Sequence, residues 1–104
     1  MPEVARKGGT DSVASPDGSG DKCKSPSTSA TDVGSDNVFV ESVGVVREGD
    51  TMASHNGPEC TPHAPALSTF SGTVYANGKK IGRKGDSYSD HTITSGSSKV
   101  IAGG

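Results

Sequence analysis

The sequence contains no tryptophan, and its aromatic residues are two phenylalanines and two tyrosines. Hydrophobic residues make up only 29% of the 104 residues, whereas glycine alone fills 15 positions. So few bulky side chains cannot build a large apolar core, and the composition approaches that of disordered chains. Valines and isoleucines nevertheless occur in short groups, and glycines recur at fixed places. We therefore expect one folded domain, residues 1–104, with a thin core that needs a metal ion, a disulfide or a partner surface for stability.

Other absences exclude further classes of protein. The net charge is −2, and lysines and arginines form no stripe with aromatic residues, so we expect no nucleic-acid binding. No apolar run of 18 residues is present, which argues against a membrane-spanning helix. The first residues, MPEVARKGG, lack the apolar segment of a secretory signal peptide. Without such a signal, Cys23 and Cys60 are better explained as free thiols or metal ligands, although a disulfide between them stays open.

An internal repeat is the most informative feature of the sequence. Residues 38–55 align without a gap with residues 74–91, at an offset of 36 residues. Both segments contain an Arg-x-Gly-Asp group preceded by β-branched residues, and both end in a histidine, His55 or His91. Fixed-period similarity of this kind is typical of proteins built from repeated structural units.

A weaker third copy opens the chain, at VARKGGT in residues 4–10. In this alignment Gly9 stands in place of the aspartate, and Ala14 stands in place of the histidine. The sequence therefore predicts three repeat units, the first of them degenerate. Their approximate ranges are 1–11, 37–55 and 73–91.

The pattern within each unit predicts an all-β fold of short hairpins, and no segment has helical periodicity. Asn77-Gly78 lies between two β-branched runs and is a strong signal for a two-residue hairpin turn. The matching Glu41-Ser42 is a poorer turn, so we expect a different loop geometry there. A short final strand is expected from Lys99 to Ala102.

Two predicted loops separate the units. Residues 12–36 consist almost entirely of polar and turn-forming residues, which predicts a long loop that is functional, disordered or irregularly wrapped. Residues 56–69 contain three of the six prolines, together with Cys60 and His63. Because proline fixes the backbone angle φ, this second loop is expected to be stiff and suited to holding ligands in place.

The soft and imidazole donors of this half of the chain form one candidate metal site. Its predicted ligands are His55, Cys60, His63 and His91. Three imidazoles and one thiolate suit tetrahedral zinc, and four protein ligands leave no open position, which indicates a structural rather than a catalytic site. Cys23 is a rival ligand, but it lies between two lysines, whose charge disfavours a nearby metal ion. A Cys23–Cys60 disulfide would remove Cys60 from the set.

These motifs together resemble the PAAR-repeat proteins, the small spike tips of type VI secretion systems and contractile phage tails. The resemblance rests on the start MPEVARKG, the central GPECTPHAP and the segment VYANGKKIGRKGD followed by a histidine. It implies a small cone of β-hairpins with pseudo-threefold symmetry. It also implies a Zn²⁺ ion near the apex, with iron as the less favoured metal, and the ligands carried over are the four residues named above.

The resemblance further implies a mechanical function without catalytic residues. One such tip caps the blunt end of a trimeric β-helical spike, sharpens it and contacts the target membrane transiently as the spike pierces the envelope. In some members of the family, extra domains attached to the cone are toxins. No such domain is expected here, and effector cargo stays open as a partner. The implied location is a phage tail baseplate, or the bacterial cytoplasm before delivery by type VI secretion.

Two alternatives remain open from the sequence. The first is a small zinc hydrolase that uses His55, His63 and His91 with a water molecule as the fourth ligand, which requires Cys60 to lie away from the metal. The second is a free-standing binding module stabilised by zinc.

Overall fold

The computed structural model describes residues 2–19, 23–57 and 59–103. The first residue of the predicted unit 1–11, and parts of the predicted loops 12–36 and 56–69, therefore lie outside the described residues. The described part is all-β, with short antiparallel strand pairs, which confirms the predicted fold class. Within it, no helix has the length and hydrophobicity needed to cross a bilayer. The strands are β1 Ser12–Ser19, β2 Ser25–Ala30, β3 Phe39–Val40, β4 Val43–Gly44, β5 His55–Asn56, β6 Pro62–His63, β7 Tyr75–Ala76, β8 Lys79–Lys80, β9 Ser87–Tyr88 and β10 His91–Ile93.

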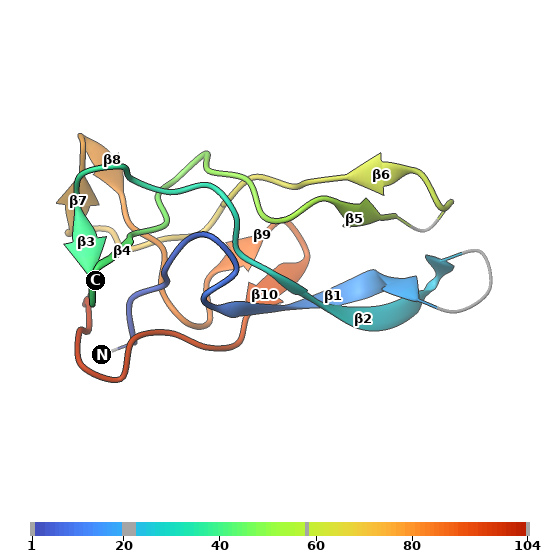
Figure 1. The fold of residues 1–104 in the computed structure, drawn as a ribbon, viewed down its shortest axis with the longest axis horizontal. Helices are drawn as coiled ribbons and strands as arrows, with labels where there is room; N and C mark the ends of the chain where they lie inside the picture. Colours follow the sequence, from blue (N-terminus) through green and yellow to red (C-terminus); the bar gives the residue numbers. More distant parts are fainter. Residues whose placement is uncertain (1, 20–22, 58, 104) are drawn as a thin grey trace.

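The molecule is elongated, with extents of 39 × 23 × 22 Å. Figure 1 shows the hairpins β3–β4 and β7–β8 at one end, together with both chain termini; we call this end the base. The hairpins β1–β2 and β5–β6 project toward the opposite end, which we call the tip. The strands β9 and β10 lie between the two ends and extend the β1–β2 hairpin into a four-stranded sheet of order β2-β1-β10-β9.

Three equivalent corners of the chain form a closed ring of backbone hydrogen bonds near the base. The N–H of Ala5 donates to the carbonyl of Gly82 at 3.0 Å, the N–H of Gly82 donates to Val46 at 2.8 Å, and the N–H of Val46 donates to Ala5 at 3.1 Å. Each of these residues immediately precedes the arginine of its unit. The three predicted units therefore meet around one pseudo-threefold axis.

The first unit is divided between the two ends of the chain. The buried hydroxyl oxygens of Ser35, Ser71 and Ser97 each accept hydrogen bonds from the N–H groups two and three residues further on. Residues 97–102 are therefore the part of the first unit that is equivalent to residues 35–40 of the second unit and residues 71–76 of the third. The predicted boundary at residues 1–11 describes only half of that unit.

The C-terminal half of the first unit is anchored on the N-terminal half. The N–H of Val4 donates to the carbonyl of Val100 at 3.0 Å, and Ile101 forms a single antiparallel bridge with Glu3. The strand predicted for residues 99–102 is therefore reduced to this bridge.

The two hairpin turns at the base have the same geometry. Asn77 and Gly78 have φ angles of 57° and 76°, and Glu41 and Ser42 have φ angles of 53° and 67°. The prediction of a different loop at Glu41-Ser42 is therefore wrong. Position in the repeat imposes the two-residue turn, although neither residue is favoured at positive φ.

The predicted long loop at residues 12–36 is also wrong, because it contains the two longest strands, β1 and β2. Along β1 the buried residues Val13, Ser15 and Asp17 alternate with more exposed ones, as expected for a strand with one covered face. Two of these three inward residues are polar, so the hydrophobic alternation that normally marks a strand is missing from the sequence.

The Arg-x-Gly-Asp corners form tight turns closed by the aspartate. In the second and third units, the arginine N–H donates to the aspartate Oδ2 at 2.9 Å, between Arg47 and Asp50 and between Arg83 and Asp86. In the first unit, the Arg6 N–H makes the same bond at 2.7 Å to Asp11. The aspartate of this unit is therefore not replaced by Gly9; it follows two residues later.

The core is small and divided into two layers along the axis. The layer nearer the base takes matching residues from the three units, and the other layer lies toward the tip. The first contains Val4, Val40, Val45, Ala76, Ile81 and Ala102. The second contains Ala5, Val13, Val46, Met52, Leu67, Tyr88 and Ile93. Both layers are thin, as the composition predicts.

Candidate metal centre

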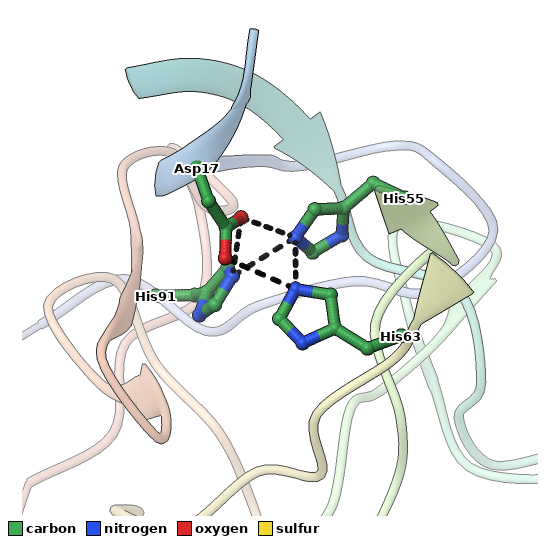
Figure 2. A group of neighbouring side chains, drawn as sticks. All are labelled: Asp17, His55, His63 and His91. Atoms are coloured by element: carbon green, nitrogen blue, oxygen red, sulfur yellow. Dashed lines mark hydrogen bonds and ion pairs between the residues drawn. The ribbon is translucent and has the colours of Figure 1, made fainter. Parts of the chain in front are cut away.

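Four side chains from three different strand pairs converge on one point beyond the second core layer (Figure 2). Asp17 comes from β1, His55 and His63 come from the β5–β6 hairpin, and His91 begins β10. His55 and His63 are directly opposite each other in the antiparallel pair, which places both imidazoles on the same face. Each of the four offers one ligand atom, and these atoms all lie within 4.8 Å of one another.

Three of these four residues occupy related positions in the repeat. His55 and His91 each lie five residues after the aspartate of their corner, and Asp17 lies six residues after Asp11. The pairing of β1 with β2 is irregular between Ser15 and Ser19, as in a β-bulge. A bulge inserts an extra residue and redirects a side chain. Between these two points β1 advances four residues while β2 advances two, and Asp17 lies within this irregular segment with its side chain directed toward the histidines (Figure 2).

The distances within the cluster suit a small metal ion. The His55 Nε2 atom lies 2.9 Å from Asp17 Oδ1 and 2.9 Å from each of the Nε2 atoms of His63 and His91. His63 Nε2 lies 3.2 Å from Asp17 Oδ2, and His91 Nε2 lies 3.4 Å from Asp17 Oδ1. Ligands bound tetrahedrally at zinc-like distances are separated from one another by about 3.3 Å.

Hydrogen bonding alone does not explain this arrangement. The Nε2 atom of His55 has three close polar neighbours, and a ring nitrogen carries at most one hydrogen. Two nitrogens that face each other at such distances repel when both carry hydrogens and also when both present lone pairs. A cation between the nitrogens and the carboxylate removes both conflicts. The cluster could therefore hold a metal ion.

Groups around the cluster orient the imidazoles. The His55 Nδ1 atom lies 3.2 Å from the carbonyl oxygen of Ala53, so its hydrogen is donated there and the Nε2 lone pair faces the cluster. The His91 Nδ1 atom lies 2.7 Å from Asp90 Oδ1, although the angle does not meet hydrogen-bond geometry. His91 is buried and His63 is the most accessible of the three, with 36% of its side chain exposed. A metal ion would therefore enter past His63.

The carboxylate of Asp17 is ionised in this environment. Burial alone would raise its pKa, but the polar contacts with His55 and His63 and the electrostatic effect of His63 and His91 together outweigh burial, so the pKa lies below its usual value. An ionised carboxylate is the form that binds a metal ion, and it also balances part of the ion's charge.

Gly18 allows the two tip hairpins to approach each other beside the cluster. It has a φ of 96°, and a Cβ atom added to it would lie 2.8 Å from Ser27 Oγ and 3.2 Å from the carbonyl oxygen of Asn56. A side chain at this position would therefore both strain the backbone and push β5 away from β1.

The structure places Cys60 elsewhere than predicted. Cys60 forms a disulfide with Cys23, so it offers no thiolate, and it does not belong to the converging group. The predicted ligand set of His55, Cys60, His63 and His91 must therefore be corrected, with Asp17 as the fourth residue. The preference for free thiols over a disulfide, which came from the missing signal peptide, was misplaced for the same reason.

Asp17 is the functional residue that the sequence interpretation missed. Alignment of the first unit on Gly9 places Ala14 at the histidine position, so it does not indicate Asp17 as a ligand. Alignment on Asp11, the true corner aspartate, brings the metal-ligand position to within one residue of Asp17. The offset of one residue that remains falls in the irregular part of β1, and the sequence does not reveal this irregularity.

The fold and the site together define a small all-β repeat protein with a candidate metal centre of three histidines and one aspartate. No protein-family model matches the sequence, and no curated protein matches it significantly.

Proposed function

We propose that this protein is a non-catalytic, metal-stabilised tip that caps the trimeric β-helical spike of a contractile injection machine, as the resemblance to PAAR-repeat proteins implies. In this proposal the base docks on the spike, with one molecule of this protein per trimer. The opposite end of the molecule leads into the target envelope. The machine is a type VI secretion system or a contractile phage tail.

One observation supports this proposal most strongly: equivalent apolar residues are exposed on all three units at the base. Phe39, Tyr75 and Ile101 occupy the same position after the buried serine of their units and are 57%, 55% and 54% exposed. Each follows a partly exposed valine in the sequence. Apolar groups repeated around a pseudo-threefold axis match a partner with threefold symmetry, because each can contact the same patch on a different subunit.

The metal centre has a separate place in the proposal. We assign Zn²⁺ to it, because three imidazoles and a carboxylate at tetrahedral separations suit this ion. When bound, the ion would link β1, β5–β6 and β10 by strong, short bonds. The tip would then resist load although few apolar side chains support it.

The experiment measures binding of the protein to the trimeric β-helical spike encoded in the same genome. Replacing Phe39, Tyr75 and Ile101 together by Asp is expected to abolish binding, because truncation of buried anchor residues typically costs at least about 2 kcal/mol each. Single substitutions should weaken it by smaller, similar steps.

Val33→Asp is the matched control. Val33 is also apolar and 42% exposed, but it does not belong to the set of three equivalent positions. Binding should survive this change. Equal binding by the control and the triple variant would contradict the proposed docking surface, and a stoichiometry other than one per trimer would contradict the proposed function.

The zinc hydrolase alternative gains one supporting observation, because Cys60 lies away from the cluster as that function requires. However, Asp17 supplies a fourth protein ligand where the hydrolase needs a metal-bound water. Zinc-loaded wild-type protein is therefore expected to hydrolyse activated esters no faster than the zinc-loaded Asp17→Ala variant. That variant is the reference because one ligand position on its metal is freed for water.

A further inference from the structure

The disulfide joins the ends of two hairpins that belong to separate sheets. Cys23 lies in the connection between β1 and β2, and Cys60 lies in the connection between β5 and β6. Their Cα atoms are 5.2 Å apart, although 37 residues separate them in the sequence. In the part of the chain that the structure describes, β5 and β6 form a two-stranded sheet of their own, separate from the sheet that contains β1 and β2.

The same two hairpins supply three of the four residues of the metal centre. Asp17 belongs to the β1–β2 hairpin, and His55 and His63 belong to the β5–β6 hairpin. The direct polar contacts between these side chains run from the carboxylate to the two imidazoles. The cluster and the disulfide are therefore two cross-links between the same pair of elements, one toward the middle of the molecule and one at the end.

We propose that the Cys23–Cys60 disulfide and the metal centre are thermodynamically coupled, so that closing the disulfide strengthens metal retention and bound metal protects the disulfide from reduction. The disulfide restricts the distance between the hairpins and so reduces the entropy lost when the metal gathers its ligands. Coupling between two sites is reciprocal, so the metal must favour the disulfide by the same factor. This inference depends on the metal site and not on docking to a spike.

The coupling makes metal retention depend on redox conditions. Forming the disulfide converts two thiols to one S–S bond with loss of two protons and two electrons. A low-molecular-weight disulfide such as oxidised glutathione accepts them and is itself cleaved to two thiols. In a reducing compartment the open form holds the metal less tightly. Transfer to an oxidising environment closes the tip and fixes the ion.

The first experiment measures the dissociation constant of Zn²⁺ by competition with a chromogenic chelator. Oxidised wild-type protein is compared with the Cys23→Ser/Cys60→Ser double variant, in which no thiolate can bind the ion. The dissociation constant is expected to be about tenfold higher in the double variant, within the usual range for coupled sites. An equal or lower dissociation constant in the double variant would overturn the proposal.

The second experiment uses only the wild-type chain, so it does not depend on folding of the double variant. The ratio of disulfide to dithiol is measured in glutathione redox buffers of fixed pH, with and without Zn²⁺. Zinc is expected to shift the midpoint toward the disulfide by a factor similar to that of the first experiment. The His63→Ala variant should lose this shift, because its metal centre is incomplete.

The opposite result has a distinct signature. If Cys60 replaces Asp17 as a ligand in the reduced protein, zinc will favour the dithiol. The Co²⁺-substituted protein will then gain a sulfur-to-metal charge-transfer band on reduction. That outcome would overturn the coupling proposed here and restore the ligand set that the sequence predicts.

Discussion

At the scale of single residues, partly buried arginine–aspartate pairs fix each corner of the ring. The pair in the first unit is the most enclosed, because the Asp11 side chain is fully buried. Arg6 donates to it from the backbone N–H at 2.7 Å, from Nε at 3.0 Å and from Nη2 at 2.8 Å, and the Ser95 hydroxyl donates at 2.9 Å. Burial would raise the pKa of Asp11, but these hydrogen bonds outweigh it and lower the pKa below its usual value.

Replacing Asp11 by Asn is expected to lower the free energy of unfolding by about 2–3 kcal/mol at neutral pH, since charge-assisted hydrogen bonds are lost and the Arg6 charge loses its partner. Urea denaturation of the metal-free proteins measures the change. Asp36→Asn is the control, because Asp36 pairs with Lys7 on the surface and its side chain is 97% exposed. That control should leave stability nearly unchanged. Equal effects of the two substitutions would contradict the structural importance of the buried corner.

The same pair gives a prediction for pH dependence. Because folding lowers the pKa of Asp11, its ionised form contributes full stability at pH values above the usual aspartate pKa of 3.8. This contribution is lost as the pH falls through the lower pKa of the folded state. The stability difference between wild-type protein and Asp11→Asn should therefore be constant near neutrality and shrink below pH 4 or so. A difference that grows with acidification would contradict the lowered pKa.

At the scale of elements, the repeat imposes the same turn on two sequences of unequal suitability. Ser42 and Gly78 occupy equivalent positions, with φ angles of 67° and 76°. A Cβ atom at Gly78 would meet no atom within 4 Å, so only the backbone conformation distinguishes the two residues. Ser42→Gly is expected to raise stability by about 1 kcal/mol, and Gly78→Ser is expected to lower it by about as much. Thermal unfolding measures both, and changes of the same sign would contradict a shared turn geometry.

The elements also show why the sequence predicts some hairpins and not others. The hairpins at the base carry β-branched residues and the strong Asn77-Gly78 turn, so their local pattern agrees with their structure. The strand β1 instead buries the polar residues Ser15 and Asp17, and Asp17 belongs to the candidate metal centre. Period-two alternation of hydrophobic residues cannot reveal such a strand, because the residues it buries are those that normally mark loops.

The candidate site was predictable to a similar extent and for a similar reason. Register in the repeat indicates His55 and His91, and proximity indicates His63, and the structure brings all three together. The fourth residue depends on long-range geometry. Cys60 is the predicted ligand closest in sequence to His63, but it lies in the turn at the end of its hairpin, where it is bonded to Cys23. Sequence spacing measures the reach of a ligand along the chain and does not show the direction in which a hairpin points.

At the scale of the whole molecule, two different devices compensate for the thin core. At the base, the chain ends close the ring. The hydroxyls of Ser35 and Ser71 donate to the turn residue of the following unit, Asn77 or Gly103, and Ser97 bonds the carboxylate of Glu41 in the same way. Toward the tip, the linking features are the candidate metal centre and the disulfide. The base is therefore stabilised by contacts between units, whereas the tip depends on cross-links.

This division predicts a local effect of metal removal. Saturating zinc at about 100 times its dissociation constant adds about 2.7 kcal/mol to stability, which raises the melting temperature of a domain of this size by about 10–20 °C. His63→Ala should abolish this increase.

In hydrogen exchange, chelation should speed exchange of the amides of β1, β2, β5 and β6. The ring amides of Ala5, Val46 and Gly82 should keep their protection, because their hydrogen bonds lie outside the cross-linked region. Uniform loss of protection along the chain would show instead that base and tip unfold as one cooperative unit, with the metal stabilising both.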